Sequence, residues 1–118
     1  MLRIPHTWAV SGEVKVASGD TDFVLPFYVP VPAGQTVRLV GVRARINNGA
    51  SASATFKMQR DGADITGYTG IVASNTSPSV TADGGLFTDS QTFALVITAV
   101  TGTPRNLTVT AFLDYTVS

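Results

Sequence analysis

The sequence predicts an all-β fold: an antiparallel β-sandwich or jelly roll of about eight strands, with no substantial helix. Three observations support this prediction. Apolar and polar side chains alternate in nearly every apolar segment, as they do in a strand with one buried face. The chain contains 16 Thr, 15 Val and 11 Gly but only one Glu and two Lys, which favours strands and turns over helices. No segment shows the apolar stripe of a helix over three turns.

Residues 1–6 are expected to form an N-terminal arm that precedes the first strand. Leu2 and Ile4 are apolar, and the proline that follows them cannot donate a hydrogen bond to a strand ladder. Alternation begins at Trp8, so residues 7–118 are expected to form a single β-sandwich domain. Burial of Leu2 and Ile4 against a neighbouring subunit would stabilise an assembly. The alternative is that both fold back onto their own sandwich.

Each of the next two segments contains an irregularity. Residues 23–31 alternate, but two prolines on the polar face cannot donate, which predicts an edge strand or an interrupted one. Residues 36–47 change phase, because the apolar residues are odd-numbered up to Leu39 and even-numbered from Val40 onward. One extra residue near Val40 and Gly41, a β-bulge, would keep both halves facing the core.

The dipeptide Asp61-Gly62 is the strongest hairpin signal in the chain. A two-residue turn at this point predicts three cross-strand pairs: Arg60 with Ala63, Gln59 with Asp64, and Met58 with Ile65. Residues 74–85 are polar and rich in turn-forming residues. They are expected to form a long loop that contains at most a short strand at 79–82.

The last two apolar segments are expected to form a hairpin. Residues 91–100 are apolar on both faces, which is typical of a central strand buried from both sides. Residues 107–117 alternate, with apolar residues at odd positions as in the preceding segment. If both odd-numbered sets face the core, a five-residue loop at 101–105 brings the two strands into register. The pairs would be Ala99 with Leu107, Ile97 with Val109, and Leu95 with Ala111.

The composition predicts little chemistry. The 118 residues suffice for one domain with its own core. The absence of cysteine excludes disulfides and thiolate metal sites, and a single histidine, His6, excludes a site of several imidazoles. Eight basic residues balance eight acidic ones, which argues against nucleic-acid binding through bulk charge. We therefore expect no catalytic residues, no metal site and no cofactor.

The low charge indicates contacts between subunits. Charged residues make up 14% of the chain, against about 25% in an ordinary soluble domain, and a surface so poor in charge is weakly protected against self-association. Besides Leu2 and Ile4, the candidate interface residues are Phe112, on the outward face of its strand, and Arg43 and Arg45, which share one strand face. The arginines either form a solvated face or meet an acidic partner surface.

Four segments together resemble small β-sandwich proteins of tailed-bacteriophage virions: GDTDF at 19–23, VPVPAGQTV at 29–37, FKMQRDGADI at 56–65 and LTVTAFLDY at 107–115. The resemblance rests on strand and turn patterns and spans most of the chain. It implies a non-enzymatic structural role, as a capsid decoration (cement) protein or a minor tail component. The implied partners are further copies of the chain, in a homo-oligomer such as a trimer, and other phage structural proteins.

This role is expected to involve neither nucleic acid nor a membrane, since the charges balance and no apolar run is long enough to cross a bilayer. The N-terminal residues lack the apolar stretch of a signal peptide. Synthesis in the host cytoplasm and a final location in the virion are therefore expected.

A second class of function remains open, that of a carbohydrate- or receptor-binding sandwich. In such a module an aromatic side chain in a loop would stack on a sugar ring. Tyr68, flanked by Gly67 and Gly70, is the candidate ligand-binding residue, and a host surface glycan would be the partner. Trp8 lies on the apolar face of its strand, where core packing accounts for it.

Overall fold

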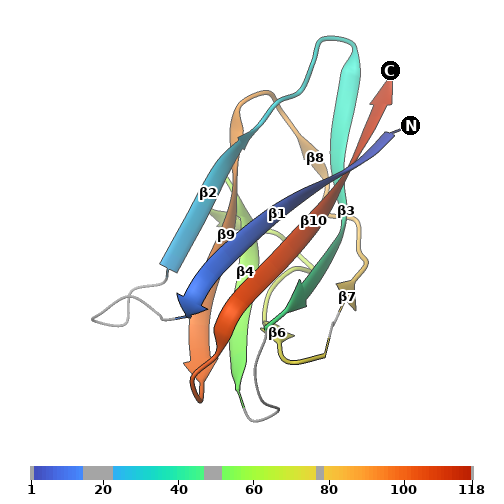
Figure 1. Ribbon diagram of the computed structural model, residues 1–118. Helices are drawn as coiled ribbons and strands as arrows, with labels where there is room; N and C mark the ends of the chain where they lie inside the picture. The colour runs from blue at the N-terminus through green and yellow to red at the C-terminus, as the bar shows by residue number, and fades with distance from the viewer. Residues whose placement is uncertain (1, 15–22, 47–51, 77–78, 118) are drawn as a thin grey trace.

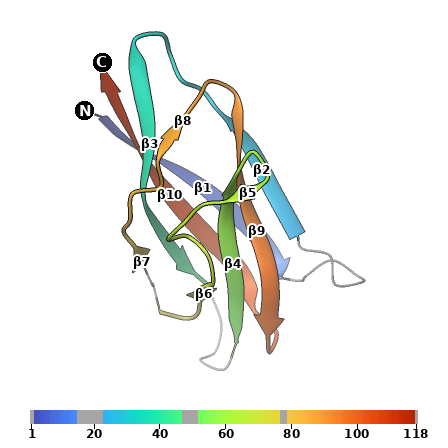
Figure 2. The same ribbon diagram turned by 180° about the vertical axis from the view of Figure 1, so that it is seen from behind.

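The structure is a computed structural model that describes residues 2–14, 23–46, 52–76 and 79–117. Within these ranges the regular structure consists of β-strands, and no helix occurs. The strands form two five-stranded sheets with antiparallel pairing throughout, and the sheets pack face to face (Figures 1 and 2). The predicted antiparallel β-sandwich is confirmed.

The first sheet is built from both ends of the chain. It contains β1 (Leu2–Glu13), β10 (Arg105–Val117) and β3 (Gln35–Arg45) in that order, and the short strands β7 (Ser79–Val80) and β8 (Leu86–Phe87) both pair with β3. β10 is therefore a central strand, and β1 is an edge strand. Leu2 lies opposite Tyr115, so the start of β1 and the end of β10 lie side by side at one corner of the molecule (Figure 1).

The second sheet contains β2 (Phe23–Val29), β9 (Gln91–Thr101) and β4 (Ser53–Arg60) in that order, and β5 (Ala63–Asp64) and β6 (Ile71–Ala73) both pair with β4. The side chains of β9 are buried on both faces from Phe93 to Ile97, as predicted for a central strand. β2 is an edge strand that ends immediately before Pro30, as its prolines predicted.

The pairing of the strands is that of a jelly roll. β1 pairs with β10, β2 with β9, β3 with β7 and β8, and β4 with β5 and β6, so the chain pairs like one long hairpin. Rolling of this hairpin adds the pairs β3–β10 and β4–β9. The described ranges contain ten strands, where about eight were expected. Four of them, β5 to β8, are only two or three residues long, too short to show alternation in the sequence.

The predicted β-bulge is confirmed. Phe112 of β10 lies opposite Gly41, whereas Leu113 lies opposite Leu39, so Val40 is the extra residue on β3. The bulge restores the phase of the strand, and the apolar residues before and after it are both buried.

The predicted turn at Asp61 and Gly62 is confirmed as well. Both residues have positive φ, 52° and 80° respectively, as the turn type of a two-residue hairpin requires. The pairs Arg60–Ala63 and Gln59–Asp64 form as expected. The third predicted pair, Met58 with Ile65, is not part of the ladder, because β5 ends at Asp64. One hydrogen bond still joins the two residues, from the Ile65 amide to the Met58 carbonyl at 3.0 Å.

The predicted hairpin between the last two long strands is wrong. β9 and β10 lie in opposite sheets, so residues 102–104 form a corner between the sheets and the three predicted pairs do not exist. The carbonyl of Pro104 in this corner accepts a hydrogen bond from the Val14 amide at 2.8 Å. Alternation was read correctly as far as Ile97, since odd-numbered side chains of both strands face the core. They meet across the core instead of within one sheet, and alternation does not distinguish these arrangements.

The first strand begins earlier than expected. Residues 2–6, predicted as an arm, are the first half of β1 and pair with β10. This pairing is available because β10 extends to Val117 and offers residues 111–115 as ladder partners. Pro5 lies opposite Phe112, and its missing N–H is tolerated because β1 is an edge strand.

Aromatic contacts join the edge strands β1 and β2 across the sandwich. His6 stacks on Phe27 with 3.6 Å between ring centroids, and Trp8 makes T-shaped contacts with Phe27 and Phe93 at centroid distances of 5.7 and 5.2 Å. Burial lowers the pKa of His6, which favours the neutral imidazole in this stack. Trp8 is buried in the core, as predicted.

Candidate functional site

The turn aspartates of the hairpin serve structural roles. The Asp61 carboxylate accepts a hydrogen bond from the Thr92 amide at 3.0 Å, and Gln59 donates to the Asp64 carboxylate at 2.8 Å. The hydrogen bond from Gln59, with that from Lys57, lowers the pKa of Asp64. Among the described residues, no three His, Asp or Glu side chains are grouped to hold a metal ion. The same part of the chain holds no helix long and apolar enough to span a membrane.

The first candidate surface is apolar and lies at the end of the first sheet. We call it the terminal shelf, and it consists of Leu2 and Ile4 from β1 and Tyr115 and Val117 from β10. These side chains share the face of the sheet that forms the core further along, but Leu2 is 63% exposed and Val117 is 78% exposed. Together with Pro32 and Gln35 they line a groove of about 440 Å³.

Polar contacts hold the two strands of the shelf in place. On the opposite face of the sheet, the Arg3 guanidinium donates to both carboxylate oxygens of Asp114, at 2.7 and 3.0 Å. This hydrogen bonding lowers the pKa of Asp114. The Tyr115 hydroxyl donates to the Pro30 carbonyl at 3.2 Å. The shelf is therefore an ordered surface, although it lies at the two ends of the described chain.

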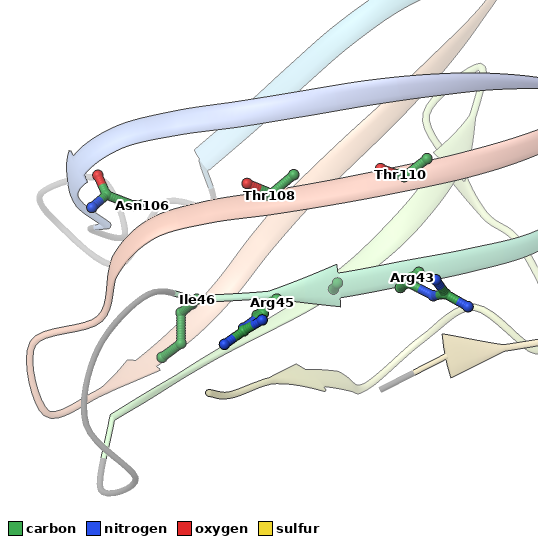
Figure 3. Close-up of a pocket in the computed structure, with 7 residues that line it drawn as sticks. Arg43, Arg45, Ile46, Asn106, Thr108 and Thr110 are labelled. Carbon is green, nitrogen blue, oxygen red and sulfur yellow. The ribbon is translucent and has the colours of Figure 1, made fainter. Parts of the chain in front are cut away.

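The second candidate surface lies on the outer face of the first sheet (Figure 3). We call it the arginine groove, and its side chains are Arg43 and Arg45 from β3 with Asn106, Thr108 and Thr110 from β10. Arg43 lies opposite Thr110 and Arg45 opposite Thr108 in the ladder, so the two arginines and the two threonines are neighbours on adjacent strands. The groove has a volume of about 370 Å³.

The two arginines of the groove differ from the other described cations. Arg3 and Arg38 form ion pairs with Asp114 and Asp83, Lys57 pairs with Asp64 at 3.1 Å, and Arg60 donates to the Gly84 carbonyl at 2.6 Å. Within the described ranges, neither Arg43 nor Arg45 makes an ion pair or a side-chain hydrogen bond. The groove thus presents two positive charges that no acidic side chain in the described part of the chain neutralises.

The interface residues predicted from sequence do not form one surface. Leu2 and Ile4 lie on the terminal shelf, whereas Arg43 and Arg45 lie on the outer face of the same sheet, nearer its other end. Phe112 points outward, as predicted, and is half-buried between its ladder partners, Pro5 of β1 and Gly41 of β3. Alternation located Phe112, Arg43 and Arg45, whereas Leu2 and Ile4 were chosen as apolar residues of an expected arm. Neither argument showed which of the five lie together.

The prediction that Tyr68 binds a ligand must be corrected. Its side chain is fully buried, and its hydroxyl donates to the Ala82 carbonyl at 2.6 Å and accepts from the Ala82 amide at 3.2 Å. Burial raises the pKa of the phenol. The Tyr68 carbonyl also accepts from the Met58 amide at 2.8 Å, which turns this loop inward against β4. The ring offers no free face to a sugar.

The exposed tyrosine is Tyr28, which sequence reasoning passed over. It lies on the outer face of β2 and is 72% exposed, beside the half-exposed Val24 on the same face. The alternation of residues 23–31 contained the signal, because it turns the partly buried Phe27 and the buried Val29 inward and therefore turns Tyr28 outward.

Comparison with known proteins gives little. No family model matches the sequence, and no curated protein matches it. Among solved structures, one match is described as the structure of infectious bursal disease virus, Gx strain, with 8% sequence identity and a TM-score of 0.43. The match covers 98% of this chain and 38% of the other, so this chain spans well under half of its length. A likeness at this level establishes neither a shared fold nor a function.

Proposed function

We propose that this chain is a non-enzymatic structural subunit of a virion that binds neighbouring subunits through the terminal shelf. In its finer form, supported by the resemblance of the strand and turn segments, the proposal assigns it to tailed bacteriophages as a capsid decoration (cement) protein or a minor tail component. Its partners are then further copies of itself and other virion proteins. The observation that carries the proposal is the shelf, an apolar surface left open at the end of an ordered sheet.

The architecture and the composition support the same proposal. Jelly-roll domains recur in viral capsids, although they also occur in lectins, so the fold supports the role by analogy alone. The charged fraction of 14% leaves much of the surface uncharged, which suits a subunit with several neighbours.

The energetics of the shelf favour association. Full burial of an aliphatic side chain contributes about 1.5–3 kcal/mol, and Leu2, Ile4 and Val117 are all exposed in the single chain. The ladder between β1 and β10 already orders the backbone that carries these side chains. Association therefore avoids most of the entropy cost that a disordered arm would incur on binding.

The test replaces the exposed aliphatic side chains of the shelf together. The triple variant Leu2→Ser, Ile4→Ser, Val117→Ser should fold, because these side chains contribute little to the core. Purified protein would be added to virions that were assembled without it, from the virus whose genome carries this reading frame. The variant should co-sediment with the particles at least about tenfold more weakly than the unaltered protein, since the lost burial exceeds 1.4 kcal/mol.

A matched control keeps the number of lost aliphatic groups equal. Val24, Val72 and Leu86 are each about half exposed and lie outside the shelf, so the serine variant at these three positions should bind as the unaltered protein does. Equal binding by the shelf variant would contradict the proposal. A reading frame whose neighbours include no capsid or tail genes would contradict the phage assignment.

A further inference from the structure

We propose that the arginine groove binds an acidic saccharide, one that carries sulfate or carboxylate groups. The inference goes beyond the structural role and involves other residues on the other face of the sheet. It also moves carbohydrate recognition away from Tyr68, which is buried, to a groove of charged and hydroxyl-bearing side chains.

Unsatisfied charge is the first step of the argument. Arg43 and Arg45 are two residues apart on one strand face, so their backbone positions are about 7 Å apart. The two positive charges that these neighbouring positions carry repel each other, and no described acidic side chain lines the groove to offset them. A ligand with negative groups would remove this repulsion. Guanidinium groups bind sulfate and carboxylate oxygens through paired N–H donors.

The neutral polar groups of the groove supply the second step. Thr108 is exposed beside Arg45, and the Thr110 hydroxyl is held at 3.0 Å from the Thr7 hydroxyl. Asn106 has a φ of 55° and accepts a hydrogen bond from the Gly12 amide through Oδ1 at 2.8 Å, which orients its amide nitrogen as a donor. These groups can hydrogen-bond the hydroxyls of a sugar ring while the arginines hold its acidic substituents.

Size and polarity favour a saccharide over a macromolecule. The apolar residues at the groove, Ala44 and Ile46, are buried, so no exposed apolar side chain lines it as an anchor for a protein partner. The volume of about 370 Å³ suits one or two sugar units. Nucleic-acid binding usually draws on a broad basic surface, whereas this chain has a formal net charge of zero.

Calorimetric titration with defined probes tests the proposal. A fully sulfated heparin disaccharide and digalacturonate separate the sulfate from the carboxylate source, and maltose serves as the neutral sugar. The unaltered chain should bind at least one acidic disaccharide in the millimolar range or better and bind maltose at least about tenfold more weakly. Each of Arg43→Gln and Arg45→Gln should weaken binding about tenfold or more, the effect of losing a hydrogen bond to a charged group.

The control removes the same charge elsewhere. Lys57→Gln alters the second sheet and should leave saccharide binding unchanged, as should the serine variant of the terminal shelf. No saturable binding of either acidic disaccharide would overturn the proposal. So would equal binding by the Arg43→Gln, Arg45→Gln double variant, or tighter binding of a hexa-aspartate peptide or a dT hexanucleotide. None of these outcomes bears on attachment to virions, so the two proposals can fail separately.

Discussion

At the scale of single residues, Tyr68 shows how one hydroxyl fixes a loop to the core. Its oxygen bonds both the carbonyl and the amide of Ala82, which ties the turn after β5 to the segment that precedes β8. The ring itself is fully buried. Removal of the hydroxyl therefore affects hydrogen bonding and leaves the shape of the core almost unchanged.

We expect Tyr68→Phe to lower the free energy of unfolding by about 1–3 kcal/mol, because the polar groups of Ala82 lose their side-chain partner. Urea denaturation followed by circular dichroism measures this change. Tyr28→Phe is the matched control and should change stability by only a few tenths of a kcal/mol, since Tyr28 is exposed. Equal stability of the two variants would show that the Tyr68 hydroxyl does not hold the loop.

At the scale of elements, local signals predicted what local geometry decides. The bulge at Val40 follows from the phase change in a single strand, and the turn at Asp61 and Gly62 follows from two residues that accept positive φ. The failed hairpin between β9 and β10 depended on a long-range fact. Alternation reports which face of a strand is buried, but it does not report which sheet the strand joins.

The candidate surfaces show the same division. Alternation along β3 placed Arg43 and Arg45 outward, as the structure has them, but the hydroxyl groups opposite them depend on the pairing of β3 with β10. Likewise, Leu2 was a candidate from sequence, whereas Val117 joins the shelf only because the two ends of the chain pair. Single side chains could be predicted from their strand, and the surfaces that they form could not.

Gly84 decides how closely the segment before β8 approaches β3. Its amide donates to the Leu39 carbonyl at 2.9 Å, and the Leu39 amide donates to the Gly85 carbonyl at 3.3 Å. A Cβ at Gly84 would lie 2.8 Å from the Cβ and Cδ2 of Leu39, closer than side-chain carbons approach. The segment can lie against β3 only because this position has no side chain.

We expect Gly84→Ala to lower the free energy of unfolding by about 1–3 kcal/mol, the usual cost of overpacking. Gly41→Ala is the control, because a Cβ there would meet its nearest neighbour, the Val80 carbonyl oxygen, at 3.4 Å. That variant should stay close to the unaltered protein in thermal denaturation. A Gly84→Ala protein as stable as the control would mean that the segment shifts away from Leu39 without loss.

At the scale of the whole molecule, one sheet depends on both ends of the chain. β10 lies between β1 and β3, so its last residues support two ladders, whereas the first residues of β1 support one edge. The fold is therefore asymmetric in its tolerance of truncation. The contribution of each end can be separated from the role of the terminal shelf in association.

Deletion of residues 1–5 should leave a folded domain of modestly lower stability, because Leu2 and Ile4 are exposed and the edge strand retains its second half. Deletion of residues 113–118 should abolish folding. It removes the buried Leu113, a loss of about 2–5 kcal/mol, together with the ladder partners of both β1 and β3, against a total stability of about 5–15 kcal/mol. Circular dichroism and urea denaturation of both truncations measure the difference. If the chain without residues 1–5 unfolds as a monomer, those residues belong to the core, and the shelf cannot be a surface held in reserve for a neighbour.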